Sequence, residues 1–290
     1  MALLLKGKEV SDVLSAYVSR DVFELGKKGV VPGLAVVRVG ESPDDLAYER
    51  SIVKKCELLK IKAYLYPLPN DVKEERLLTL IENLNLNGAI HGILMLRPLP
   101  SHLNEAVICE SLSPLKDVDG ITSLSMAGVY AGRRIGFPPC TARACIEILR
   151  HYGIRTAGKN AVVVGRSLVI GRPLAMMLMD GDATVTLCHS KTACLQEIVK
   201  QADIVAVALG KKGIIGKECL REGQTVIDVG INVDDDGKIS GDVDFDAAGD
   251  IVAAITPSPG GVGAVTTALI ARHVTDAALE IDGGRHAAWI

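Results

Sequence analysis

The chain has 290 residues, of which 48% are hydrophobic and 23% are charged, and its formal net charge at pH 7 is −3. This length predicts about two domains of ordinary size, and the hydrophobic content is sufficient for packed cores. The slightly acidic balance excludes bulk electrostatic attraction to nucleic acid or to an anionic membrane surface.

The chain opens with MALLLKGKEV, whose apolar run is too short for a signal peptide. No stretch approaches the ~18 consecutive apolar residues that a membrane span requires. We therefore expect a cytoplasmic protein with no membrane or nucleic-acid partner. The seven cysteines lack the C-x-x-C spacing of zinc sites, so we expect reduced thiols and no metal site.

The first half of the chain alternates apolar runs of strand length with longer amphipathic stretches, which is typical of parallel α/β units. Ser42 and Pro43 have the residue types of an N-cap and a first helical position, and they predict a helix to about Lys60. The predicted strands are 33–39, 61–67 and 89–98, and the further helices lie near 72–85 and 103–112. The loop 113–120 precedes a glycine-rich segment that crosses to about residue 139.

The second half repeats the alternation after a helix that begins at Thr141. The predicted strands are 160–165, 183–188, 203–209, 225–230 and 251–257, followed by a last helix from about 266 to 281. Strands that are apolar throughout are covered on both faces, so we expect a Rossmann-like, doubly wound parallel sheet in a two-domain α/β protein. The domain boundary is expected near residues 138–141.

The stretch VVVGRSLVIGRP (162–173) predicts a strand, a glycine turn and a helix start, which together favour an anion such as a phosphate. Its glycine spacing is not that of the dinucleotide fingerprint G-x-G-x-x-G. After the next strand the chain reads CHSKT, without the carboxylate that accepts from a ribose 2′-hydroxyl. Arg166, Ser190 and Lys191 thus favour NADP over NAD. The alternatives are that Arg166 is a solvated loop residue and that Ser190 caps a helix over 191–201.

The chain resembles the methylenetetrahydrofolate dehydrogenase/cyclohydrolase family over nearly its whole length. The motifs that carry the resemblance, in chain order, are PGLAVVRVG, GILMLRPLP, PLKDVDG, PPCT, VVVGRSLVIGRP, CHSKT, VIDVGIN, GDVDF and ITPSPGGVG. The resemblance implies a folate-binding catalytic domain formed by 1–139 and 265–290, and an NADP-binding domain formed by 140–264. It also implies a homodimer that acts on tetrahydrofolate substrates.

The resemblance also assigns site residues. Its dinucleotide contacts correspond to Gly165, Arg166, Ser167, Ser190 and Ile231. Its folate side, including the catalytic positions, corresponds to Tyr48, Asp119, Pro259, Gly260, Gly261, Val262 and Gly263. Asp119 can accept hydrogen bonds from a pterin amino group and ring N–H, although alone it could equally be a turn residue in D-V-D-G.

Two positions depart from the family pattern. The family lysine four residues after its tyrosine is Ile52 here, and the glutamine of G-I-L-V-Q-L-P is Leu96. Residues i and i+4 share a helix face, so the lysine would stand beside Tyr48 over the substrate. Arg97 is a poor replacement because neighbouring strand residues point to opposite faces, and Lys55 lies ~10.5 Å further along the helix.

These departures predict a methylenetetrahydrofolate dehydrogenase that uses NADP and has weak or absent cyclohydrolase activity, since Ile52 and Leu96 offer no proton chemistry. One alternative is the ordinary bifunctional enzyme, in which Lys55 or water takes over the role of the missing lysine in hydrolysis. The other is a non-catalytic protein that binds folate or NADP. Assays of hydride transfer and of methenyl hydrolysis distinguish the three.

Overall fold

The computed structural model describes residues 1–234 and 236–282, and it divides into two compact units. Unit 1 comprises Met1–Asp12 and Thr141–Thr266, and unit 2 comprises Val13–Cys140 and the described residues from Thr267 onward. The family resemblance places residues 1–12 in the folate-binding domain, whereas in the structure they belong to unit 1. The reason is strand β1 (Leu3–Leu4), which pairs in parallel with β11 (Ala254–Ile255).

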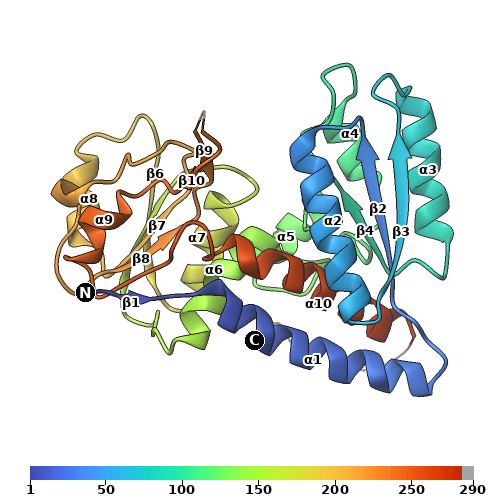
Figure 1. Cartoon of the computed structure of the whole chain (residues 1–290), viewed down its shortest axis with the longest axis horizontal. Helices are drawn as coiled ribbons and strands as arrows, with labels where there is room; N and C mark the ends of the chain where they lie inside the picture. Colours follow the sequence, from blue (N-terminus) through green and yellow to red (C-terminus); the bar gives the residue numbers. More distant parts are fainter. Residues whose placement is uncertain (235, 283–290) are drawn as a thin grey trace. The chain divides into compact units, whose positions relative to one another are not determined.

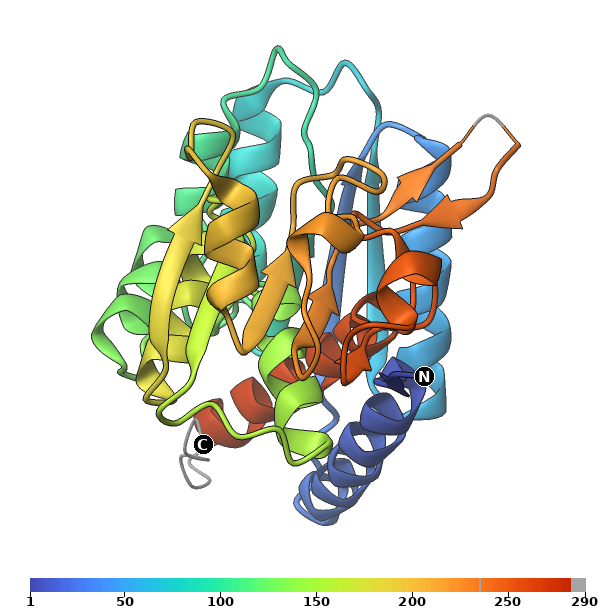
Figure 2. The same ribbon diagram turned by 90° about the vertical axis from the view of Figure 1, so that its left-hand side faces the viewer.

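Unit 1 contains a six-stranded sheet in the order β1-β11-β8-β7-β5-β6, in which every paired strand is parallel. Figure 2 shows these strands side by side. The central strands are β5 (Asn160–Val164), β6 (Thr184–Cys188), β7 (Ile204–Val207) and β8 (Thr225–Asp228). The chain order reverses between β5 and β7, and such a switch point is where open parallel sheets bind ligands. The predicted doubly wound parallel sheet is confirmed.

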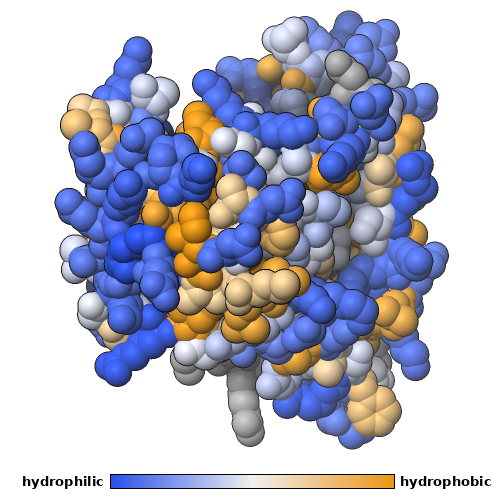
Figure 3. All heavy atoms as spheres, turned by 60° about the vertical axis from the view of Figure 1, so that its left-hand side comes forward, coloured by the Kyte–Doolittle hydropathy of each residue, from blue (hydrophilic) through white to orange (hydrophobic). Residues whose placement is uncertain are grey.

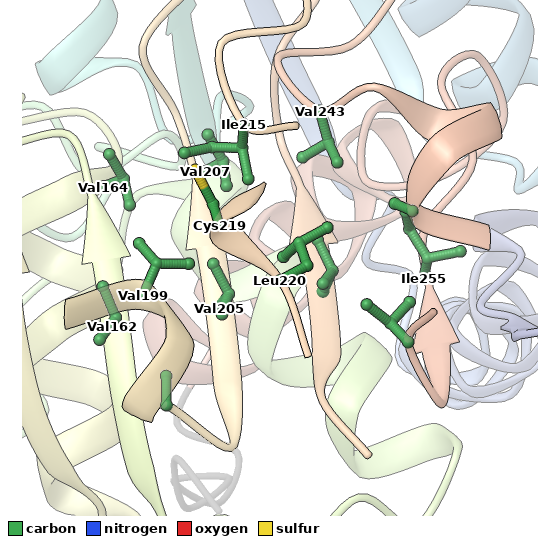
Figure 4. Close-up of a cluster of buried hydrophobic side chains, with 14 of the residues drawn as sticks. Val162, Val164, Val199, Val205, Val207, Ile215, Cys219, Leu220, Val243 and Ile255 are labelled. Carbon is green, nitrogen blue, oxygen red and sulfur yellow. The ribbon is translucent and has the colours of Figure 1, made fainter. Parts of the chain in front are cut away.

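The helices of unit 1 cover this sheet. They are α6 (Cys140–His151), α7 (Gly171–Asp180), α8 (Leu195–Gln201), the 3-10 turn η1 (Lys217–Cys219) and α9 (Phe245–Gly249). Figure 4 shows one face of the sheet, where valines of β5 and β7 pack with Val199 of α8 and with Cys219 and Leu220. Alternate strand residues therefore build this core. A short antiparallel hairpin, β9 (Asn232–Val233) with β10 (Ile239–Ser240), follows β8.

Unit 2 contains a three-stranded parallel sheet in the order β3-β2-β4, formed by β2 (Gly33–Val39), β3 (Lys62–Leu68) and β4 (Gly92–Met95). Its further helices are α2 (Pro43–Leu58), α3 (Glu74–Leu86), α4 (Glu105–Glu110) and α5 (Ser123–Ala131). Helix α2 lies on one face of the sheet and α3 on the other (Figure 1). Residues 35, 37 and 39 of β2 form a core with side chains of α3 and α4.

Two long helices have residues in both units: α1 (Gly7–Lys27) and α10 (Gly263–Ile281). Within unit 2, Arg272 of α10 forms an ion pair with Asp21 of α1, with 2.6 Å between Nη1 and Oδ2. No helix within residues 1–234 and 236–282 is long and apolar enough to cross a membrane. Residues 283–290, which the sequence analysis placed in the folate-binding domain, lie outside the described residues.

Hydrophobic side chains also reach the surface. On the face drawn in Figure 3 they form a band bordered by hydrophilic residues. The exposed large hydrophobic residues of unit 1 include Leu168, Val169, Met179 and Leu187. Leu187 belongs to β6, which stands at the edge of the six-stranded sheet.

Candidate functional site

The turn after β5 is built from two glycines that approach other backbone closely. Gly165 has φ +130°, and a Cβ added there would collide with the carbonyl oxygen of Ala208, just after β7. Its N–H donates to the Cys188 carbonyl at 2.9 Å. A Cβ on Gly171 would collide with the Gly165 carbonyl oxygen. The spacing G-x-x-x-x-x-G therefore closes a tight turn at the switch point of the sheet, where only glycine fits.

Ser167 and Arg166 have different environments in this turn. The hydroxyl of Ser167 accepts from the N–H groups of Ile170 at 3.1 Å and Gly171 at 3.4 Å, which are the N-cap and the first residue of α7. Arg166 is exposed, and no other residue in the described part of the chain forms a hydrogen bond or ion pair with its guanidinium. The turn therefore presents a cation whose donors are not used by the protein.

The segment after β6 also presents polar groups to solvent. His189 donates its backbone N–H to the Thr192 hydroxyl at 2.8 Å and accepts from the Lys191 N–H at 3.1 Å. Ser190 is exposed. Helix α8 begins only at Leu195, and its N-cap is Cys194, so the alternative that Ser190 caps a helix over 191–201 is wrong.

Two buried aspartates, which the sequence analysis did not single out, order the loops after β7 and β8. Asp242 accepts from three successive backbone N–H groups, those of Leu209, Gly210 and Lys211, at 2.6 to 2.9 Å. Asp228 accepts from the N–H groups of Gly230, Asp242 and Val243. Burial raises the pKa of Asp228 to about 6, and the nearby Asp242 charge contributes to this shift. In the sequence, Asp228 lies in the motif VIDVGIN and Asp242 lies in the motif GDVDF, so both aspartates belong to motifs that carry the family resemblance.

The loop after β11 lies beside Ile231. The Ser258 hydroxyl donates to the Gly230 carbonyl at 3.1 Å, and a Cβ on Gly263 would lie 3.7 Å from Cδ1 of Ile231. Ile231 itself is 63% exposed. The structure thus brings together Ile231 and the glycine loop, which the sequence analysis assigned to different ligands. Of the predicted loop residues, Pro259, Gly260 and Gly263 are exposed, whereas Gly261 and Val262 are buried.

Helix α2 carries Tyr48 and Ile52 in unit 2. As predicted, it begins at Pro43, and the Ser42 hydroxyl accepts from the Asp45 N–H at 3.2 Å. Tyr48 is half-buried, and Ile52, one turn further on the same face, is 1% exposed. The Lys55 ammonium donates to the Ser15 hydroxyl at 3.3 Å.

The end of β4 carries Leu96, which is 4% exposed and donates its N–H to the Val37 carbonyl at 2.9 Å. Alternation along β2 and β4 places residues 37 and 95 in the core with α3 and α4. Leu96 therefore points to the opposite face, the face on which α2 lies. Both departures from the family pattern are apolar side chains buried on that side of the sheet.

The motif K-D-V-D-G divides its tasks among its three charged residues. Lys116 donates to the carbonyls of Leu84 and Asn87 at the end of α3. Asp117 accepts from the N–H groups of Ile121 and Thr122 and from the Ser125 hydroxyl. The turn-forming carboxylate is thus Asp117, which leaves Asp119 free of that task.

Asp119 is half-buried beside Cys140 and Arg97. Burial raises the pKa of its carboxyl to about 6, although the positive charge of Arg97 and hydrogen bonds from the thiol and the backbone N–H of Cys140 act to lower it. Asp119 therefore changes charge close to neutral pH, unlike an exposed aspartate, which titrates near 3.9. Within residues 1–234 and 236–282, no group of three or more His, Cys, Asp or Glu residues is arranged to hold a metal ion.

Family models match most of the chain. The model of the tetrahydrofolate dehydrogenase/cyclohydrolase catalytic domain matches residues 5–119, and that of the NAD(P)-binding domain of the same family matches residues 139–281. The chain is 48% identical over 278 residues to the bifunctional protein FolD of Clostridium botulinum, an alignment that covers 96% of this chain and 99% of that protein.

Solved structures agree with these matches. The bifunctional enzyme FolD, methylenetetrahydrofolate dehydrogenase/cyclohydrolase, from Campylobacter jejuni superimposes with a TM-score of 0.94 at 38% identity, covering 97% of this chain and 99% of that one. The methylenetetrahydrofolate dehydrogenase-cyclohydrolase of Trypanosoma brucei, complexed with NADP cofactor and inhibitor, gives a TM-score of 0.91 at 32% identity, with 97% and 98% covered.

Proposed function

Because the chain belongs to the tetrahydrofolate dehydrogenase/cyclohydrolase family, we propose that it oxidises 5,10-methylenetetrahydrofolate to 5,10-methenyltetrahydrofolate with NADP. Unit 1 carries the NADP site and unit 2 carries most of the folate site. The observation that carries the cofactor assignment is the exposed guanidinium of Arg166, which has no partner within residues 1–234 and 236–282 and lies beside the glycine turn of β5.

The residues of unit 1 fit NADP. Gly165 and Gly171 leave no side chain in the turn, so a ligand's phosphates can approach the backbone at the start of α7. Arg166 and Ser190 supply the donors that a 2′-phosphate requires, and no carboxylate follows β6 within CHSKT. The Trypanosoma brucei relative, whose structure was solved with NADP, supports the same choice.

The oxidation demands alignment more than a protein base, because the nitrogen lone pairs of the substrate expel the hydride. When bound, NADP supplies the hydride acceptor. Asp119 accepts hydrogen bonds from the pterin ring, and Tyr48 packs beside the substrate on the face of α2. In unit 1, the glycines of the loop Pro259–Gly263 allow a flat ligand ring to approach the backbone closely.

The second step of the family, hydrolysis of the methenyl compound, is proposed to be weak or absent. Water attack requires a positioned group that removes a proton. Ile52 and Leu96 occupy the positions of the family lysine and glutamine, and both are buried apolar side chains. Lys55 is held by Ser15 on α1.

The second candidate is the ordinary bifunctional enzyme. The curated relatives are named as bifunctional proteins, and this favours the second candidate over the loss of hydrolysis. The specific observation against it is the pair of apolar residues at positions 52 and 96. The two candidates agree on the dehydrogenase step and differ only in the fate of the methenyl product.

One paired assay tests the proposal. Hydride transfer is followed by NADPH absorbance with methylenetetrahydrofolate, and hydrolysis is followed by the decay of authentic methenyltetrahydrofolate. NADPH formation with decay at the buffer rate supports the dehydrogenase without hydrolase. Decay well above the buffer rate supports the bifunctional enzyme, and absence of NADPH formation leaves only a non-catalytic binding protein.

We further propose a cytoplasmic homodimer formed through unit 1. The dimer is supported by the open edge of β6 and by the exposed hydrophobic residues around it, such as Leu187. Light scattering of the purified protein should give twice the chain mass of 30.7 kDa. A mass of one chain at micromolar concentration would exclude a stable dimer.

A further inference from the structure

Arg97 is a half-buried cation to which the proposed function gives no role. It follows β4, and its side chain is 21% exposed. Its Nη1 lies 3.4 Å from Oε1 of Glu105, and in the described part of the chain its buried Nε has no hydrogen-bond partner. Buried donors are nearly always satisfied in folded proteins, so this unused donor requires an explanation.

Glu105 does not satisfy the guanidinium. Its other oxygen, Oε2, accepts from the backbone N–H of Leu99 at 2.9 Å, and its contact with Arg97 is long for a charged pair. One side of the guanidinium is thus steadied by Glu105, and the remaining N–H groups keep their capacity to donate. Within the described residues, the Arg97 guanidinium is thus held by Glu105 while most of its N–H groups make no hydrogen bond to the protein.

Arg97 and Asp119 are neighbours. Ile93 of β4 bridges in parallel to Asp117, so the two segments run side by side toward Arg97 and Asp119. Arg97 is the nearby positive charge that acts on the Asp119 carboxyl. A guanidinium, which only donates, therefore lies close enough to a carboxylate, which only accepts, for its charge to act on that carboxylate.

This pair matches one edge of a pterin. The ring N–H and the 2-amino group donate, and the adjacent 4-oxo group accepts. We propose that Arg97 is a specificity-determining residue that donates a hydrogen bond to the 4-oxo group while Asp119 accepts from the ring N–H and the amino group. This inference rests on the proposed function, because it takes the folate substrate as the ligand of Asp119.

This role differs from that of the missing lysine. Arg97 contacts Glu105, the first residue of α4, so it lies on the α4 side of the sheet. Ile52 and Leu96 belong to the α2 side. Arg97 therefore binds the pterin ring and does not replace the family lysine that transfers a proton.

The test compares two ligands by calorimetry: tetrahydrofolate and 4-amino-4-deoxytetrahydrofolate, in which a donor replaces the acceptor oxygen at position 4 and N3 loses its hydrogen. Wild-type protein should bind tetrahydrofolate more tightly. Arg97→Leu should weaken tetrahydrofolate binding by about tenfold to a hundredfold, the loss expected for a hydrogen bond to a charged group. It should leave the 4-amino compound unchanged or bound more tightly, and Arg97→Lys should keep part of the preference.

Arg134→Leu is the matched control, because Arg134 is another half-buried arginine of unit 2, paired with Glu280 at 3.0 Å. It should change neither affinity. NADP affinity should stay the same in all variants, which shows that unit 1 is unchanged, and retained binding of the 4-amino compound by Arg97→Leu excludes misfolding of unit 2. Equal effects of Arg97→Leu on both ligands, or no effect on either, would overturn the inference.

A pH series gives a second readout. The charged and titratable groups around Asp119 are Arg97, Asp117 and Cys140, and His273 of α10 contacts Cys140. Loss of the Arg97 charge should move the midpoint of tetrahydrofolate binding to higher pH, and an unmoved midpoint would count against the inference. If wild-type protein binds no tetrahydrofolate at all, the proposed function fails and this inference falls with it.

Discussion

Arg38 of β2 and Glu49 of α2 form a buried ion pair, with 3.0 Å between Nε and Oε2. Glu49 directly follows Tyr48, so the pair fixes the helix that carries Tyr48 and Ile52 to the centre of the unit 2 sheet. Arg38 also donates to the carbonyl of Gly40. The position of this face of α2 thus depends on a charge pair that is largely shielded from water.

Breaking this pair should destabilise the protein strongly. We expect Glu49→Leu to lower the free energy of unfolding by about 3–5 kcal/mol, because it leaves the Arg38 charge buried and unpaired. The double variant with Arg38→Leu should recover part of the loss, since no charge then remains buried. Denaturant unfolding measures both, and Asp12→Ala, at the exposed Lys8–Asp12 pair, is the control with little effect. A double variant less stable than Glu49→Leu would contradict this account.

Arg166→Ala should reduce NADP affinity by about tenfold to a hundredfold and change NAD affinity little, because a charged contact to the 2′-phosphate contributes about 1.5–3 kcal/mol. Titration of each cofactor measures the difference. Arg155→Ala, at another exposed arginine of unit 1, should leave both affinities unchanged. Equal losses for NADP and NAD would show that Arg166 does not read the 2′-phosphate.

Tetrahydrofolate binding should weaken as the pH falls through about 6. Burial raises the pKa of Asp119 to about 6, and only its ionised form accepts from both the ring N–H and the amino group. The affinity should be highest above that pH and fall below it, whereas an unshifted aspartate would lose affinity only near pH 4. Asp119→Asn should bind weakly with no such transition. Calorimetry across this range decides, and a flat profile for wild-type protein would refute the assignment.

Restoring the two family residues should create hydrolysis. We expect Ile52→Lys with Leu96→Gln to raise methenyl hydrolysis by about 10²–10⁴-fold over the buffer rate, the usual contribution of a positioned base. The gains in hydrolysis rate of the two single variants should together be smaller than the gain of the double variant, because a lone lysine in an apolar pocket has neither partner nor fixed position. NADPH formation should survive in the double variant. Rapid hydrolysis by wild-type protein that Lys55→Ala abolishes would instead identify Lys55 as the base.

The sheets could be predicted from sequence because their strands are continuous apolar runs. The predicted strands 33–39 and 160–165 differ from β2 and β5 by one residue at most. Helix α1 was missed, although Val10, Val18, Val22 and Leu25 are buried along one face and repeat at nearly helical spacing. Strand β1 carried no such signal, because two residues are too few to show a period.

The candidate site was less accessible to sequence reasoning. The glycine turn and the departures at positions 52 and 96 could be read from motifs. Two features could not be read: the Nε of Arg97, which has no hydrogen-bond partner in the part of the chain that the structure describes, and the difference between Asp117 and Asp119. Neighbouring charged residues acquire different partners only through tertiary contacts. Within K-D-V-D-G, spacing alone does not distinguish the carboxylate that orders a turn from the one that remains available.

The three N–H groups that converge on Asp242 form a concave nest of the kind that binds anions. Here the protein fills that nest with its own carboxylate, which Asn232 also supports through a hydrogen bond of 3.0 Å. An incoming phosphate would have to displace a buried negative charge to use it. Of the two strand ends that flank the switch point, the one after β7 is therefore closed to anions, and the β5 turn is left as the open one.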